Sequence, residues 1–239
     1  MHPLYLDTAM EKEAGILMSE IKISLPFYKI SYAAFFVVIL SLIRGVAYSD
    51  EIGIALEAPM AILAASFCAD TYTQEITSKR SEIQRLCPMK KRICFVYRRI
   101  LIQEIFLLFL AVVGYGLFFL FQNPRIAEMK TSVQESEICK FLLYSAAVTV
   151  TLAFWGLLSN LLSCLFRNMW TGIGVCLILW LATNSSIGNK YFGAWNLFSY
   201  SFRNLENTGD FSWIYGKFVC ICTGIIIVAV LPKIIKKRG

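Results

Sequence analysis

Long apolar runs separated by shorter polar connections recur along the whole chain. Each run is close to the ~20 residues that an α-helix needs to cross ~30 Å of hydrocarbon. The fifth run is the least regular, because its continuous apolar stretch ends near Ala182. The pattern predicts an all-α integral membrane protein with six transmembrane helices, at residues 31–48, 52–69, 101–121, 141–164, 169–187 and 213–232.

A different pattern precedes the first run. Between residues 9 and 25, apolar positions such as Leu17 and Ile21 recur at helical spacing opposite Glu20, and Pro26 follows as a break. This spacing predicts an amphipathic helix that lies flat on the membrane surface. We therefore expect one transmembrane domain over residues 1–239, made of a cytoplasmic interfacial helix (1–28), a six-span bundle (31–232) and a basic cytoplasmic tail (233–239).

The connection between the second and third spans, residues 70–100, is strongly basic. It holds eight of the 23 Lys and Arg residues of the protein, namely Lys79, Arg80, Arg85, Lys90, Lys91, Arg92, Arg98 and Arg99. Lys and Arg next to membrane spans remain on the cytoplasmic side. The basic tail from Lys233 agrees with this orientation, as do Lys12, Lys22 and Lys29 before the first span. An even number of spans then predicts a multi-pass protein of the cell membrane with both termini in the cytoplasm.

Within this basic connection, residues 77–87 can form a short amphipathic helix that ends at Pro88. A short charged helix between two spans suits a membrane protein on which a soluble partner pushes. The alternative is a plain basic loop that sets orientation and has no partner, which composition alone favours.

The polar connection at residues 184–212 is unusually aromatic. Seven Phe, Tyr and Trp residues alternate there with Gly188, Gly193 and Gly209. We expect a short helix that dips back into the outer leaflet, and an ordinary interfacial belt of aromatic residues is the alternative.

Composition narrows the class of protein further. The chain is 57% hydrophobic and 16% charged, with a mean hydropathy of +0.62, whereas soluble domains have about 25% charged residues. The net charge of +7 does not indicate nucleic-acid binding, because the basic residues lie at span ends and no nucleic-acid motif accompanies them. Most cysteines lie inside apolar runs and are interpreted as buried hydrophobic residues rather than disulfide partners.

The sequence also argues against catalysis by the chain itself. The single histidine, His2, removes Ser-His triads and metal sites built from several histidines. The phosphate-binding pattern GxxxxGK[ST] is absent, so we expect no ATP hydrolysis by this chain, no metal and no cofactor of its own.

Polar groups inside membrane spans are candidate functional residues by default. Arg44 and Glu57 lie at similar depth on either side of the first outer turn, and we predict that they pair; in the alternative, each reaches the outer interface separately. Asn160 is interpreted as a hydrogen-bonding group between helices, in preference to a substrate contact. Glu104 is expected to reach cytoplasmic water.

The basic connection resembles that of a known family. Glu75 is followed thirteen residues later by Pro88, an apolar residue stands near 83–86, and Arg98 follows Pro88 by ten residues. Permease subunits of ABC-2 type ABC transporters show a similar order of Glu, Leu, Pro and Lys. The chain departs from that pattern at Lys79-Arg80, where the family has a Gly-Thr pair.

The resemblance implies a transport function. Two permease subunits, as a homodimer or heterodimer, would form the pathway, and two copies of a separate ATPase subunit would bind ATP and Mg²⁺. Coupling to that ATPase would involve the residues that match or surround the motif, namely Glu75, Arg80, Glu82, Arg85, Pro88 and Arg98. Compact permeases of this size resemble bacterial exporters of antimicrobial peptides, drugs or lipid-like substrates. The acidic residues near the outer side, Asp50, Glu51 and Glu57, would attract a cationic peptide; the alternative is a merely solvated surface.

Two other functions stay open. One is a membrane immunity or scaffold protein that binds its target without ATP or transport. The other is a membrane-embedded enzyme, which the lack of histidines and of clustered intramembrane carboxylates disfavours. Co-purification with a nucleotide-binding subunit would distinguish a permease from both.

Overall fold

The computed structural model describes residues 15, 17–49, 51–71, 88–124, 137–198 and 212–238. The regular elements of this part of the chain are helices. In chain order they are α2 (Phe27–Ile43), α3 (Glu51–Cys68), α6 (Met89–Gln122), α7 (Glu137–Phe166), α8 (Met169–Asn184), α9 (Ser186–Phe192), the short 3₁₀ helix η1 (Gly193–Trp195) and α10 (Ser212–Arg238).

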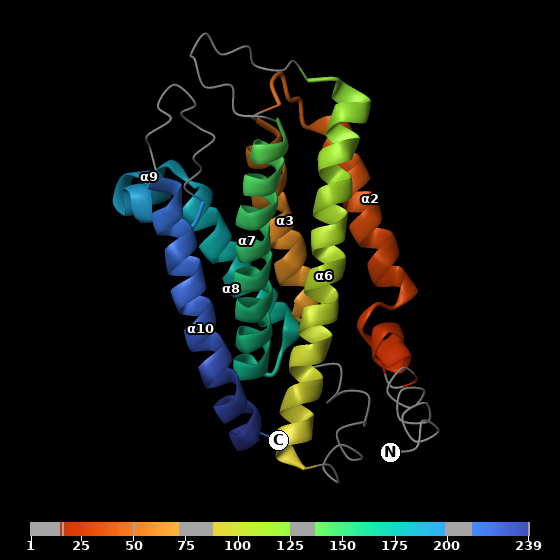
Figure 1. Cartoon of the computed structure of the whole chain (residues 1–239). Coiled ribbons are helices and arrows are strands. Elements are labelled where there is room, and N and C mark those ends of the chain that lie inside the picture. Colours follow the sequence, from red (N-terminus) through yellow and green to blue (C-terminus); the bar gives the residue numbers. More distant parts are fainter. Residues whose placement is uncertain are drawn as a thin grey trace, which may run out of the picture.

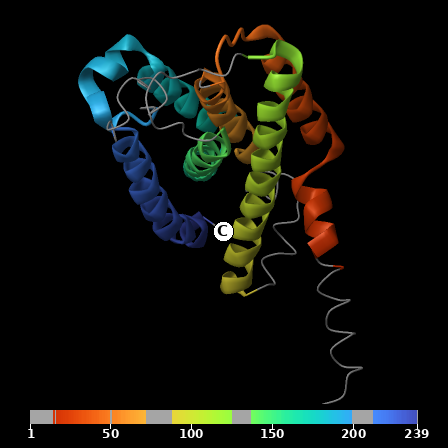
Figure 2. The same ribbon diagram turned by 45° about the horizontal axis from the view of Figure 1, so that its top comes forward.

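The helices form a bundle in which α7 is central (Figure 1). α7 packs against α3, α6, α8 and α10, while α2 packs mainly against α6 at one edge. The tilted view in Figure 2 shows α2 and α10 at opposite edges of the bundle. Most side chains of α3 are buried, whereas α2 and α8 keep many apolar side chains on the outside. Such an outward apolar surface is what lipid tails cover.

Four helices are long and apolar enough to cross a membrane, and these are α3, α6, α7 and α10. Two bent pairs raise the number to six if each pair is one span. Leu17–Ser24 and Phe27–Ile43 meet at 58°, and Met169–Asn184 and Ser186–Trp195 meet at 63°. The described residues therefore confirm an all-helical fold with four to six candidate membrane spans. Each of the six predicted segments overlaps one of the helices.

The N-terminal helix has its polar side on the protein. Leu17–Ser24 is helical, Glu20 and Ser24 are buried, and Leu17 and Met18 are exposed. The bend follows at Pro26, whose φ of −65° and ψ of 150° precede the first turn of α2. Because the apolar side chains remain uncovered, this segment can lie on a membrane surface, although residues 9–14 of the predicted helix are outside the described residues.

Basic residues gather at one end of the bundle, which we call the basic end. α2 and α6 begin there and α10 ends there, at the bottom of Figure 1. The described basic residues at this end are Lys22, Lys29, Lys90, Lys91, Arg92, Arg98, Arg99, Arg167, Lys233, Lys236, Lys237 and Arg238. At the opposite end the described basic residues are Arg44, Lys140 and Lys190. This asymmetry favours a cytoplasmic basic end.

Labelling with a membrane-impermeant maleimide tests the orientation. Cys94 is exposed near the start of α6, at the basic end, and Cys139 lies in the first turn of α7, at the other end. In a Cys139→Ser variant, intact cells should not be labelled, because the exposed Cys94 faces the cytoplasm. Adding Lys190→Cys to this variant should produce labelling, because position 190 is exposed on the outer side. Labelling of Cys94 in intact cells without permeabilisation would contradict the predicted orientation.

Candidate functional site

Only part of the predicted coupling segment can be located. The predicted helix at 77–87 lies outside the described residues, as do Glu75, Arg80, Glu82 and Arg85. Pro88 caps the N-terminus of α6 with a φ of −54° and a ψ of 139°. Proline is tolerated at that position because the first amides of a helix have no intrahelical acceptor. Arg98 lies in α6, ten residues after Pro88.

Arg98 joins α6 to the N-terminal helix. Its Nε lies 3.0 Å from Oε2 of Glu20, whose side chain is buried, while the Arg98 side chain is about one-third exposed. Arg98, at the position where the ABC-2 pattern has a lysine, thus forms an ion pair with Glu20 and joins α6 to the N-terminal helix. The two residues are 78 positions apart in sequence. Sequence reasoning selected Arg98 but not its partner, because Glu20 reads as part of an ordinary polar helix face.

Lys29 makes a second connection, between the start of α2 and the end of α3. The Lys29 Nζ donates to the backbone oxygen of Phe67 at 2.9 Å and forms an ion pair with Asp70. It also lies 5.0 Å from the centre of the Phe67 ring. Only 3% of the Lys29 side chain is exposed. A lysine expected simply to mark the cytoplasmic side is therefore a buried structural cation.

Gln103 makes the third connection. Its Oε1 accepts a hydrogen bond from Thr71 Oγ1 at 2.8 Å, and its Nε2 donates to the backbone oxygen of Ser24 at 3.2 Å. Gln103 is almost fully buried. The Gln103 side chain of α6 therefore binds the end of the N-terminal helix and also Thr71, the last described residue before the gap in the basic connection.

Together these contacts form what we call the basic-end clasp, made of Glu20, Ser24, Lys29, Asp70, Thr71, Arg98 and Gln103. The clasp holds both flanks of the basic connection, since Thr71 comes directly before residues 72–87 and α6 begins directly after them. A hydrogen bond to a charged group such as Lys29 contributes about 1.5–3 kcal/mol, and the neutral bonds of Gln103 contribute about 0.5–1.5 kcal/mol each. A displacement of the connection would therefore act on the N-terminal helix, α2, α3 and α6 together.

A second polar cluster lies inside the bundle. Lys217 of α10 forms an ion pair with Glu57 of α3 and donates to Thr151 Oγ1 of α7 at 2.7 Å. The Thr151 hydroxyl in turn donates to the Glu57 carboxylate. Lys217 Nζ also lies 3.4 Å from the backbone oxygen of Leu197. All three side chains are buried, so α3, α7 and α10 are joined by one network that we call the intramembrane cluster.

The predicted pairing of Arg44 with Glu57 is wrong. α2 ends at Ile43, and Arg44 continues in an extended conformation with an exposed side chain. Glu57 points to the bundle interior, where Lys217 pairs with it. A carboxylate buried in this way does not attract a cationic peptide from outside. The available signal was Lys217 itself, a lysine inside the sixth predicted span.

Two further polar residues of the spans contact neighbouring helices. Asn160 Nδ2 donates to the backbone oxygen of Cys68 at 3.2 Å, so α7 is hydrogen-bonded to α3 in the way the sequence favours. Glu104 does not reach water. Its Oε2 is buried, and its Oε1 accepts from Cys68 Sγ at 3.7 Å.

The comparisons with known proteins give no relative for this arrangement. No protein-family model matches the chain, and neither the curated proteins nor the solved structures contain a match. Among the residues that the structure describes, no group of three or more His, Cys, Asp or Glu side chains is placed to hold a metal ion. The contacts themselves, ion pairs and hydrogen bonds between helices, are therefore the basis for assigning a function.

Removing one member of the intramembrane cluster should destabilise the protein. Breaking a buried ion pair from one side costs about 3–5 kcal/mol, because the remaining charge stays buried without compensation. We expect Glu57→Gln and Lys217→Met each to lower the midpoint of thermal unfolding, followed by the fluorescence of the five tryptophans in detergent.

The double variant Glu57→Leu/Lys217→Met provides the control. It removes both charges, and Thr151 retains the backbone oxygen of Ala147 as an acceptor at 3.1 Å. Its midpoint should lie above that of either single variant. Additive losses would show that the two side chains are not coupled.

Proposed function

We propose that this chain is the membrane-spanning permease subunit of an ATP-driven exporter of ABC-2 type in the bacterial cell membrane. Two copies of a separate ATPase subunit would dock on the basic end, and a second permease subunit would complete the pathway. The exported substrate would be an antimicrobial peptide, a drug or a lipid-like molecule. The basic-end clasp is the observation that carries this proposal.

The clasp has the connectivity that coupling to a soluble motor requires. A partner that moves residues 72–87 pulls on Asp70 and Thr71 on one side and on α6 on the other. Those flanks are bound to the N-terminal helix and α2 through Gln103 and Lys29. Because the connecting groups are buried and partly charged, they transmit displacement without a soft intervening loop.

The length of α6 supports the same proposal. Its 34 residues extend about 50 Å, whereas the hydrocarbon core is only ~30 Å thick. The first predicted apolar position of that span is Leu101, so the turns from Met89 onward form a polar stem that continues the span without a break. Lys90 and Lys91 are exposed on this stem. A rigid basic stem suits contact with an acidic surface of a partner in the cytoplasm.

Purification of the tagged chain from its own membranes in mild detergent tests the proposal. Mass spectrometry should identify an ATPase subunit with a GxxxxGK[ST] sequence, and the complex should hydrolyse ATP. Recovery of the chain with a target protein but without any ATPase would instead support the non-transporting immunity or scaffold function.

The clasp makes a sharper prediction for that complex. Coupling free energies between sites are typically 1–3 kcal/mol, so Arg98→Gln should reduce the stimulation of ATP turnover by the permease at least about fivefold. Arg44→Gln is the matched control, because Arg44 is exposed at the opposite end and its side chain contacts neither polar network. Equal stimulation by both variants would remove the clasp from the coupling path.

A further inference from the structure

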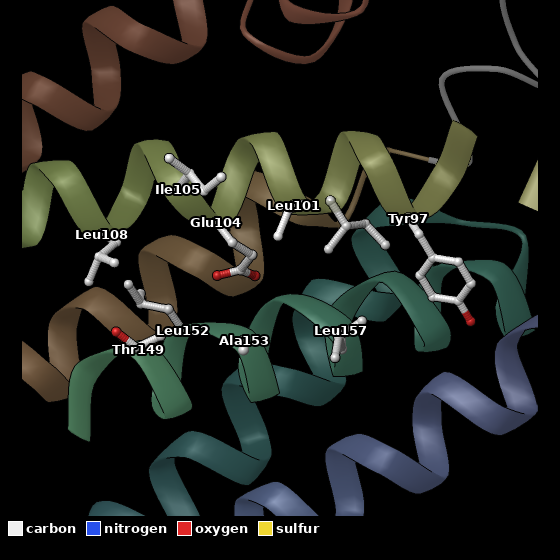
Figure 3. A pocket seen from close by; sticks show the side chains of 10 residues that line it. Tyr97, Leu101, Glu104, Ile105, Leu108, Thr149, Leu152, Ala153 and Leu157 are labelled. Carbon is white, nitrogen blue, oxygen red and sulfur yellow. The ribbon is translucent and has the colours of Figure 1, made fainter. Parts of the chain in front are cut away.

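A groove runs along the outside of the bundle between α6 and α7. It has a volume of about 380 Å³, within the range of small-molecule sites. Its accessible surface is almost wholly apolar, although Tyr97, Glu104 and Thr149 are among the residues that line it. Figure 3 shows Glu104 between the two helices, with its carboxyl group turned from α6 toward α7.

The groove opens sideways, toward the region that lipid tails occupy. Leu101 and Ile105 on its α6 side are 59% and 60% exposed. Toward the basic end, the Tyr97 hydroxyl donates to the backbone oxygen of Val228 in α10 at 2.7 Å, which ties a third helix to this end of the groove. A ligand would therefore enter from the bilayer rather than from the aqueous phase.

The polar groups of the residues that line the groove differ in their free hydrogen-bonding capacity. The hydroxyl hydrogens of Tyr97 and Thr149 are donated to the backbone oxygens of Val228 and Ser145. Glu104 receives only a weak thiol bond on Oε1, and its buried Oε2 has no hydrogen-bond partner. The unused capacity of the groove is therefore an acceptor, and a donor is the group that would satisfy it.

Gly156 gives this carboxyl group its space. A Cβ at position 156 would collide with the Glu104 carboxylate and come within 3.1 Å of Cys68 Sγ. The absence of a side chain on α7 thus leaves room for a carboxyl group directly beneath the apolar surface of the groove. An unsatisfied buried acceptor costs about 1–3 kcal/mol, which a bound donor would recover.

We propose that the groove between α6 and α7 binds a lipophilic amine from the bilayer, with the amine donating to Glu104 and the apolar body lying along Leu101, Ile105 and Leu157. The unpartnered oxygen of Glu104 selects the amine, and the apolar walls select a lipophilic body. This assignment does not depend on the transport proposal, because binding needs neither an ATPase nor a second permease subunit.

Dansylcadaverine, a fluorescent primary amine, is the probe for the test, with its N-acetyl derivative as the matched control. The protein is reconstituted in lipid nanodiscs, and saturable fluorescence enhancement is measured against empty nanodiscs. The amine should bind saturably, and the acetylated probe at least about tenfold more weakly, because a hydrogen bond involving a charged group contributes about 1.5–3 kcal/mol.

Variants then locate the site. Glu104→Gln and Gly156→Ala should each weaken binding of the amine at least about tenfold, the second by displacing the carboxyl group. Gly116→Ala is the control, because a Cβ there meets nothing within 4 Å. Unfolding midpoints identify variants that fail to fold. Equal binding of the two probes, unchanged binding by folded Glu104→Gln, or no saturable binding to the unaltered protein would each overturn the proposal.

Discussion

The pairing of one buried lysine with one buried carboxylate inside the membrane determines how this bundle is assembled. Glu57 and Lys217 satisfy each other across α3 and α10, and Thr151 of α7 completes their hydrogen bonding. An unpaired charge at the centre of a span costs about 2.5–3.5 kcal/mol or more. The same lysine also approaches the backbone of Leu197, so the segment after η1 is held by the network that joins the three helices.

α3 connects this intramembrane cluster to the basic-end clasp. Glu57 lies in its second turn, and Asp70 follows directly beyond its C-terminal end. Along its length, α7 lies beside it in the same direction, with Ser159 and Asn160 donating to its backbone oxygens. A displacement at Asp70 therefore cannot be absorbed by local bending alone, since the helix is bound at successive levels. In the proposed coupling, α3 therefore transmits a displacement from the basic-end clasp to the intramembrane cluster.

The sequence predicted the helices well because hydropathy reports directly on which segments lipid can surround. The sequence predicted the contacts between helices poorly. Hydropathy indicates which residues lie at the same depth in the membrane, but it does not indicate which helices are neighbours. Arg44 and Glu57 share a level, yet α2 ends before Arg44, and α10 supplies the cation instead. The sequence around Lys29 indicates only orientation, because its partner, Asp70, lies 41 positions away in sequence.

The clasp and the α6–α7 groove use consecutive residues of one helix. Gln103 faces the N-terminal helix and the end of α3, whereas Glu104 faces α7, as a rotation of about 100° per residue requires. Cys68, which donates to Glu104, stands three residues before Thr71, which donates to Gln103. A rotation of α6 would alter both sets of contacts at once. Any ligand that fixes the position of Glu104 therefore also restrains the clasp, and by thermodynamic reciprocity a change in the clasp alters the affinity of the groove.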